Sequence, residues 1–177
     1  MKKFLLPVSL IFIICTAFTR INSTVVRSAI TFKIRNLGIN VDGSFSGLQA
    51  DVHFDPSDPS SATIEASVDA STVNTGNSSR DEHLRSEDYF DAAHYPKITL
   101  KSVSIKHRSG DKYTGQFNLT IKGNTQSVEI PFTFSRSGDN SAFKGSFKIN
   151  RRDFSVGGSS LILSDDVTVN IDAEVKD

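Results

Sequence analysis

The sequence predicts an all-β protein: a single antiparallel barrel of eight strands with one short helical insert around residues 79–95. Three observations carry this prediction. Apolar and polar residues alternate with a period of two over eight segments. Short turns rich in Gly, Asn, Asp and Pro separate most of these segments, as in antiparallel hairpins. The sequence also lacks the long helical patterns that a parallel α/β sheet requires between its strands.

The chain begins with a predicted secretory signal peptide, residues 1–19. Lys2 and Lys3 precede an almost wholly apolar run that is shorter than the roughly 20 residues of a membrane span. Cleavage is expected between residues 17 and 23, which leaves residues 24–177 as one mature domain. We therefore expect an exported protein, either periplasmic or secreted.

Cys15 raises a second possibility, because an exported chain can be lipidated on a cysteine that follows its apolar run. Ile14 is bulky where such a site favours a small residue, so the sequence disfavours a lipoprotein. If Cys15 leaves with the signal peptide, the mature chain has no cysteine and must be stabilised by its core rather than by disulfides.

The mature chain is close to neutral. Removing Lys2 and Lys3 from 20 basic and 20 acidic residues leaves a net charge of about −2. This balance argues against nucleic acid, whose binding requires a basic surface that neutralises phosphates. Ten of the thirteen phenylalanines follow residue 23, and their rings must be buried.

The first three predicted strands precede the insert. Residues 25–35 alternate cleanly, and Gly38 then allows a turn. Residues 41–54 change parity in the middle, which predicts a β-bulge at Gly47. A turn rich in Asp and Pro separates this strand from residues 63–70.

The insert contains the densest group of charged and aromatic residues in the chain. Ser79 and Glu82 have the spacing of a capping box, which predicts the start of a helix at Ser79. Leu84, Tyr89 and Phe90 then give the insert an apolar edge that must lie against the barrel.

Five predicted strands follow the insert: residues 97–105, 113–121, 128–134, 143–149 and 167–175. The first of them changes parity past Ser102. Residues 113–121 give the cleanest alternation in the chain, and the Gly123–Asn124 turn joins them to the next strand. Residues 150–164 form a longer polar connection.

An eight-stranded barrel has an interior that side chains can fill or that can hold one small ligand. Gly43, Gly115 and Gly145 share the inward parities with the phenylalanines. Alternating large and small residues suit a solid core, but glycines beside rings equally leave room for a cavity. The pattern alone does not choose between the two.

The chain has no clear catalytic or metal-binding motif. The four histidines are far apart, and no phosphate-binding glycine loop or nucleophile elbow occurs, so we expect no metal and no cofactor. Asp81 and His83 have the chemistry of an acid–base pair. Together with Arg80 and Asp88, they are instead predicted to fasten the insert to the barrel through charged hydrogen bonds.

Residues 80–91, Arg-Asp-Glu-His-Leu-Arg-Ser-Glu-Asp-Tyr-Phe-Asp, with Tyr95-Pro96 after them, resemble the Arg-Asp-x-His-Leu, Ser-x-Asp-Phe-Phe-Asp, Tyr-Pro signature of the YceI-like family. Further blocks agree in order: Phe32-Lys33-Ile34, Leu37-Gly38, Gly43-x-Phe45, residues 115–123 and Asn150-Arg151-x-Asp153-Phe154. The resemblance covers residues 25–176. Two positions depart from the pattern: Asn36 stands where many members have histidine, and Ser155 replaces a common glycine.

The resemblance implies a lipocalin-like barrel that is exported and is not an enzyme. It also implies that the interior is hollow and holds a long apolar lipid, such as a polyisoprenoid, an isoprenoid quinone or a fatty-acid derivative. We expect the cavity wall to include Phe32, Ile34, Phe45, Leu84, Tyr89, Phe90, Phe117, Leu119, Phe132, Phe134, Phe143 and Phe147. A polar head group would be oriented at the mouth.

Two other functions remain compatible with the sequence. One is an isomerase or cyclase that acts on an apolar substrate through Asp81 and His83. The other is a solid barrel that serves as a stress-response or protein-interaction module. The resemblance further implies a homodimer, and a lipid carrier would make transient contact with a membrane or with a lipid-using protein.

Overall fold

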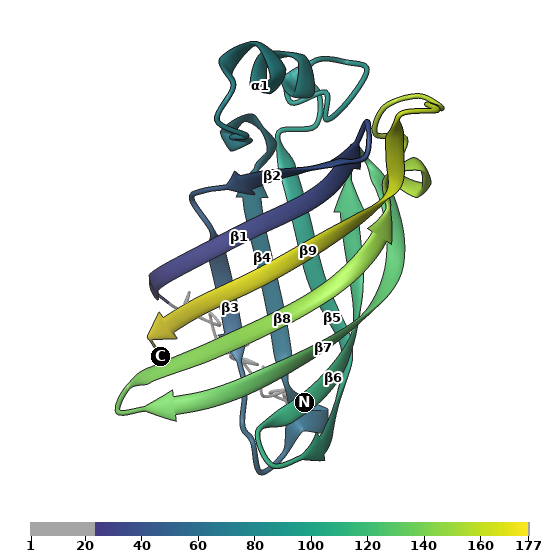
Figure 1. Cartoon of the computed structure of the whole chain (residues 1–177). Helices are drawn as coiled ribbons and strands as arrows, with labels where there is room; N and C mark the ends of the chain where they lie inside the picture. Colours follow the sequence, from purple (N-terminus) through teal and green to yellow (C-terminus); the bar gives the residue numbers. More distant parts are fainter. Residues whose placement is uncertain (1–23, 177) are drawn as a thin grey trace, which may run out of the picture.

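The computed structural model describes residues 24–176, which form one strongly curled antiparallel sheet with a short helix at one end (Figure 1). The predicted signal peptide and its cleavage region lie outside the described residues. The strands are β1 (Thr24–Asn36), β2 (Ile39–Phe45), β3 (Gln49–His53), β4 (Thr63–Asp69), β5 (Lys97–Ser109), β6 (Lys112–Ile121), β7 (Asn124–Ser137), β8 (Asn140–Asn150) and β9 (Leu163–Lys176).

Short helices lie in the connections. These are α1 (Ser78–Arg85) and the 3-10 helices η1 (Pro59–Ser61), η2 (Ala70–Thr72) and η3 (Arg151–Phe154). None of the helices within residues 24–176 is long and apolar enough to cross a membrane.

The strands pair in the order β2-β1-β9-β8-β7-β6-β5-β4-β3, and every pair is antiparallel. The all-β antiparallel fold is therefore confirmed, but the described residues contain nine strands instead of the predicted eight. The sheet curls into a half-barrel, with β2 and β3 at its two edges (Figure 1).

The additional strand comes from the segment predicted as one bulged strand over residues 41–54. Gly47 has a φ of 71°, a left-handed conformation that turns the chain instead of bulging it. Residues before the turn pair with β1, and residues after it pair with β4. The predicted bulge is thus a corner, and three residues carry the chain from one edge of the sheet to the other.

The parity change predicted past Ser102 is confirmed. The register of β5 against β6 shifts between Ser102 and Ser104, so Val103 projects outward with 62% of its surface exposed. The shift returns Ile105 to the interior, where it is buried.

Helix α1 begins earlier than the predicted capping box. Asn77 is its N-cap, and the Asn77 side-chain oxygen accepts a hydrogen bond from the backbone N–H of Arg80 at 3.0 Å. The Ser79–Glu82 cap is therefore wrong. Asn77 already has the extended backbone of an N-cap, so Ser79 falls inside the first turn.

Most of the buried apolar residues form two clusters that occupy different parts of the half-barrel. One cluster consists of Phe117, Leu119, Ile121, Ile130, Phe147, Phe154 and Val156. The other consists of Phe54, Ile105, Tyr113, Phe132 and Phe134, and lies where β5 ends and β6 begins, away from α1. This second cluster packs ring against ring, and the interior between it and the insert is hollow.

Candidate functional site

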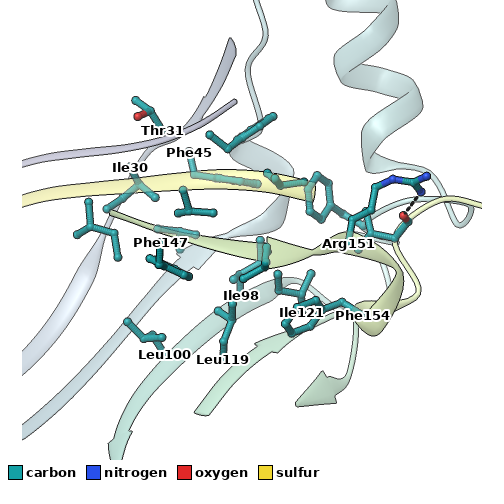
Figure 2. Close-up of a pocket in the computed structure, with 18 of the residues that line it drawn as sticks. Ile30, Thr31, Phe45, Ile98, Leu100, Leu119, Ile121, Phe147, Arg151 and Phe154 are labelled. Carbon is teal, nitrogen blue, oxygen red and sulfur yellow. Dashed lines mark hydrogen bonds between the residues drawn. The ribbon is translucent and has the colours of Figure 1, made fainter. Parts of the chain in front are cut away.

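A cavity of about 470 Å³ lies inside the half-barrel. Its wall comes from the inward faces of the strands and from the helical insert. Figure 2 shows Ile98 and Leu100 of β5, Leu119 of β6 and Phe147 of β8 directed into this space. The volume lies within the range of roughly 300–1,000 Å³ that is typical of ligand sites. The interior is therefore large enough for a small ligand and almost wholly apolar.

The end of the cavity away from α1 is closed by aromatic packing. The rings of Phe54 and Phe134 lie 4.6 Å apart, and Tyr113 stacks on Phe132 at 5.5 Å. Phe143 packs edge-on against Phe54 at 5.5 Å. Because these rings pack against one another, they form a solid floor at this end. The cavity lies between this floor and the insert.

The other end is covered by the insert. Leu84, Tyr89 and Phe90 line the cavity, as the sequence predicted. Phe90 meets Phe45 edge-on at 5.4 Å, and Phe45 lies 5.7 Å from Phe32. The insert therefore continues the aromatic wall of β1 and β2 across the mouth.

The predicted wall residues are brought together with one exception. Eleven of the twelve line the cavity, whereas Phe134 packs into the aromatic floor. Phe132 shares the parity of Phe134 and packs in the same floor but still lines the cavity, so the two differ only in their position along β7. Parity could have found several wall residues that were not singled out: Ala50, Ala66, Ile98, Leu100, Ile149, Val169 and Ile171. No periodic signal marked Phe154 and Val156, which come from η3 and the turn after it.

Polar groups in the wall concentrate at the insert end. The only basic residues among the lining side chains of residues 24–176 are Arg80, His83 and Arg151. Asn36 ends β1 at the same end, opposite Leu163. The Asn36 side-chain oxygen is buried and is the one buried side-chain polar atom in the described residues that lacks a hydrogen-bond partner. An unpaired buried acceptor is costly unless a ligand or a bound water molecule satisfies it.

Arg151 is the buried charge of the site, with 4% of its side chain exposed. It donates to the carbonyls of Ser164, Val156 and Gly158 at 2.8–3.0 Å and to the Asp165 carboxylate at 2.7 Å. Figure 2 places Arg151 beside Phe154 at the edge of the cavity. These bonds hold the connection between β8 and β9 in shape, so Arg151 is a structural part of the mouth.

The structure corrects the predicted partners of the charged residues that fasten the insert. Asp81 is buried and accepts hydrogen bonds from the hydroxyl of Thr75 at 2.6 Å and from its N–H at 2.8 Å. These two bonds hold the pKa of the Asp81 carboxyl below its ordinary value, and the bond from the hydroxyl has the larger effect. Arg80 also binds Thr75, at 2.7 and 2.9 Å. Both charges therefore fasten the helix to the loop before it, not directly to the barrel.

The loop reaches the sheet through its backbone, because Asn74 and Ser44 exchange hydrogen bonds at 2.8 and 3.0 Å. His83 packs on Tyr89, with ring centroids 4.9 Å apart, inside the insert. Asp88 attaches the insert to the connection between β8 and β9, because its backbone carbonyl accepts a hydrogen bond from the N–H of Gly157 at 2.9 Å. Because backbone groups make several of these attachments, they could not be predicted from the types of the side chains.

Two cationic side chains that were not singled out complete the attachment. Lys122, at the turn between β6 and β7, donates to the carbonyl of Glu87 at 2.6 Å. Arg85 donates to the carbonyls of Ser71 at 2.8 Å and Val73 at 3.3 Å.

One carboxylate oxygen of Asp81, a member of the acid–base pair considered above, accepts both hydrogen bonds from Thr75. No group of three or more potential ligands within residues 24–176 could hold a metal ion.

Three comparisons place this fold among known proteins. The chain is 26% identical to a UPF0312 protein of Vibrio cholerae over 178 residues, 92% of this chain and 94% of that protein. BcnA of Burkholderia cenocepacia superposes with a TM-score of 0.79 at 27% identity, covering 83% of this chain and 95% of BcnA. A polyisoprenoid binding domain from Saccharophagus degradans shares the fold, with a TM-score of 0.71 at 15% identity over 88% of this chain and 97% of that domain.

The model of the YceI-like domain matches residues 22–175, nearly the whole described chain. The match spans both the half-barrel and the insert that covers it. The chain belongs to the YceI-like domain family.

Proposed function

We propose that this protein is an exported carrier that binds a long apolar lipid inside the half-barrel. The lipid is a polyisoprenoid, an isoprenoid quinone or a fatty-acid derivative. The observation that carries the proposal is the cavity of about 470 Å³, apolar along its length and with its basic residues at one end. Membership of a family with a polyisoprenoid-binding structural neighbour supports the same ligand class.

The apolar wall accounts for affinity without hydrogen bonds. An isoprenoid or acyl tail loses no polar contacts when it leaves water, and each buried methylene contributes roughly 0.8 kcal/mol. A wall of Phe, Ile, Leu and Val side chains accepts many tails of similar width. The length of tail that fits is set by the distance from the aromatic floor to the insert.

The polar head of the lipid lies at the insert end in this proposal. There, the unpaired oxygen of Asn36 accepts a hydrogen bond from a hydroxyl or amide head. Arg80 lines the same end and uses two of its N–H groups on Thr75, and its remaining N–H groups supply donors for a carbonyl or carboxylate head. The tail then points towards the aromatic floor, where the wall carries no charged side chain.

Export is the second part of the proposal. Lys2 and Lys3 followed by an apolar run support a signal peptide, and a carrier that moves lipid across an aqueous periplasm needs a closed apolar interior.

The cavity assignment is tested by filling the interior. Ala66 lies on the wall beside Ala50, so Ala66→Trp projects a large side chain into the cavity. Glu65→Trp is the matched control, because Glu65 is exposed and lies on the opposite face of the same strand. Each purified protein is extracted with organic solvent and analysed by mass spectrometry, and its affinity for a fluorescent polyprenol is measured.

We expect lipid in the wild type and the Glu65→Trp control, and a large loss in Ala66→Trp at unchanged thermal stability. Equal lipid in both variants, or no bound or bindable lipid in the wild type, contradicts the proposal. Asn36→Leu tests the head group: it should weaken binding of a polyprenol but not of squalene, a hydrocarbon that has no polar head.

A further inference from the structure

Four large aliphatic side chains are exposed on two loop tips at one end of the half-barrel. Leu37 and Ile39 belong to the β1–β2 hairpin, with 68% and 70% of their surfaces exposed. Leu161 and Ile162 belong to the connection before β9, with 106% and 53% exposed. We call these four residues the apolar rim. Figure 1 shows the two connections side by side at the end of the sheet where the insert also lies.

The two tips form one surface. The N–H of Leu37 donates to the carbonyl of Ile162 at 2.8 Å. Asn36 pairs with Ile39 on one side and with Leu163 on the other. The rim residues are therefore held together by the backbone instead of being scattered over the surface.

The rim is continuous with the cavity. Ile162 is half exposed at the tip and also lines the cavity, as do its neighbours Ser160 and Leu163. Asn36, one residue before Leu37, lines the same end. Ile162 and Leu163 thus connect the exposed rim with the wall of the proposed lipid site.

Leu37 occupies a position that leucine ordinarily avoids. It is the first residue of a two-residue turn in which both φ angles are positive, 50° at Leu37 and 79° at Gly38. Such turns favour asparagine or glycine, because a side chain beyond Cβ is strained in the left-handed region. In the free protein 68% of the Leu37 surface stays exposed, so burial within the chain does not offset this strain.

The lack of charge on the two tips indicates which kind of surface they can bind. Residues 36–41 and 154–164 contain no Asp, Glu, Lys or Arg. Uncharged tips with protruding aliphatic side chains do not adsorb by electrostatic attraction, but they can enter the interfacial region of a bilayer.

We propose that the apolar rim docks on a lipid bilayer and that lipid passes over the rim between the membrane and the cavity. This inference rests on the proposed lipid-binding function. Docking buries the exposed aliphatic groups and brings the insert end of the cavity to the membrane surface. Because the attraction is hydrophobic, docking persists at high salt and does not require anionic lipid.

The experiment compares the double variant Leu37→Asn/Leu161→Ser with the wild type. Neither residue lines the cavity, so binding of polyprenol is preserved. Asparagine suits the left-handed turn, so the variant is at least as stable as the wild type. Val103→Ser is the control, because Val103 is exposed to a similar degree on β5, away from the rim.

Binding to unilamellar vesicles of phosphatidylcholine is measured by co-sedimentation, and the transfer of a fluorescent polyprenol from these vesicles is followed over time. We expect the wild type and Val103→Ser to bind, including at about 1 M salt, where the Debye length is about 3 Å. The double variant should bind roughly 100-fold more weakly, because burial of each leucine is worth about tenfold or more. Its transfer rate should fall in parallel.

The proposal is overturned by a lack of vesicle binding in the wild type, by equal binding and transfer in the double variant, or by binding that salt abolishes. Loss of a wild-type dimer in the double variant, seen by sedimentation velocity without any change at vesicles, would assign the rim to a second copy and also overturn it. Affinity for polyprenol in detergent micelles is measured separately. Its absence refutes the lipid-binding function, whereas vesicle binding tests the rim alone.

Discussion

The ring of Phe32 in β1 lies over Gly43, its cross-strand neighbour in β2. A Cβ atom at position 43 would fall on the ring carbons of Phe32. The glycine therefore makes the space that the ring occupies, and the ring in turn forms part of the cavity wall.

Replacing this glycine should displace the ring. We expect Gly43→Ala to lower the free energy of unfolding by about 1–3 kcal/mol, the usual cost of overpacking. Asp42→Ala, which removes only an exposed ion pair with Lys33, should change it by less than about 0.5 kcal/mol. Urea unfolding measures both. Equal stability of the two variants would show that the Phe32 ring is free to move.

Arg151 should be the most costly polar side chain to remove. Arg151→Met leaves three carbonyls and a carboxylate without their donor, so we expect a loss of about 3–5 kcal/mol. Asp165→Asn keeps an acceptor at the partly exposed end of the network and should cost about 1 kcal/mol. Thermal unfolding followed by circular dichroism tests both values. A methionine variant as stable as the wild type would refute the structural role of Arg151.

The hydrogen bonds from Thr75 to Asp81 predict a pH dependence. Because the pKa of Asp81 is lower in the folded state than in the unfolded chain, its ionised form stabilises the fold above the unfolded pKa of about 3.9. This contribution is lost as the pH falls through the folded pKa.

Thr75→Val should raise the pKa of Asp81 towards its ordinary value, whereas Thr75→Ser, which keeps the hydroxyl, should not. The stability difference between Thr75→Val and the wild type should be largest at neutral pH and shrink in acid. NMR titration of the carboxyl and unfolding at several pH values measure these effects. A difference that grows in acid would contradict the assignment.

Lys122 should control how firmly the insert is held. Lys122→Met removes the bonds from its ammonium to the carbonyls of Glu87 and Ser155, at 2.6 and 3.1 Å. We expect amide hydrogen exchange at Tyr89 and Phe90 to accelerate roughly fivefold, as for the loss of about 1 kcal/mol. Lys148→Met, on an exposed position of β8, should leave these rates unchanged. Unchanged rates in Lys122→Met would mean that other contacts hold the insert.

Most of the strands and most of the cavity wall could be predicted from alternation alone. The period of two identifies which side chains share a face, and one face of a curled sheet must be its interior. The parity change at Ser102 was visible because the apolar residues themselves change parity there.

The errors have identifiable causes. A parity change at Gly47 is the same pattern whether the chain bulges within one strand or crosses to another edge, and only the left-handed Gly47 backbone distinguishes the two. The true helix cap, Asn77, competed with an equally good cap at Ser79. Phe134 has the parity of the wall, but its distance along β7 places it in the aromatic floor.

The sequence by itself determined most of the secondary structure, most of the inward faces of the strands and the apolar edge of the insert, because these depend on local periodicity and local turn chemistry. Only the tertiary structure decided that the interior is part floor and part cavity, that Asn36 is left without a partner, and that two uncharged loop tips form one rim beside the mouth. These features depend on which residues meet across the curled sheet. Residues distant in the chain supply those contacts, and periodicity carries no information about them.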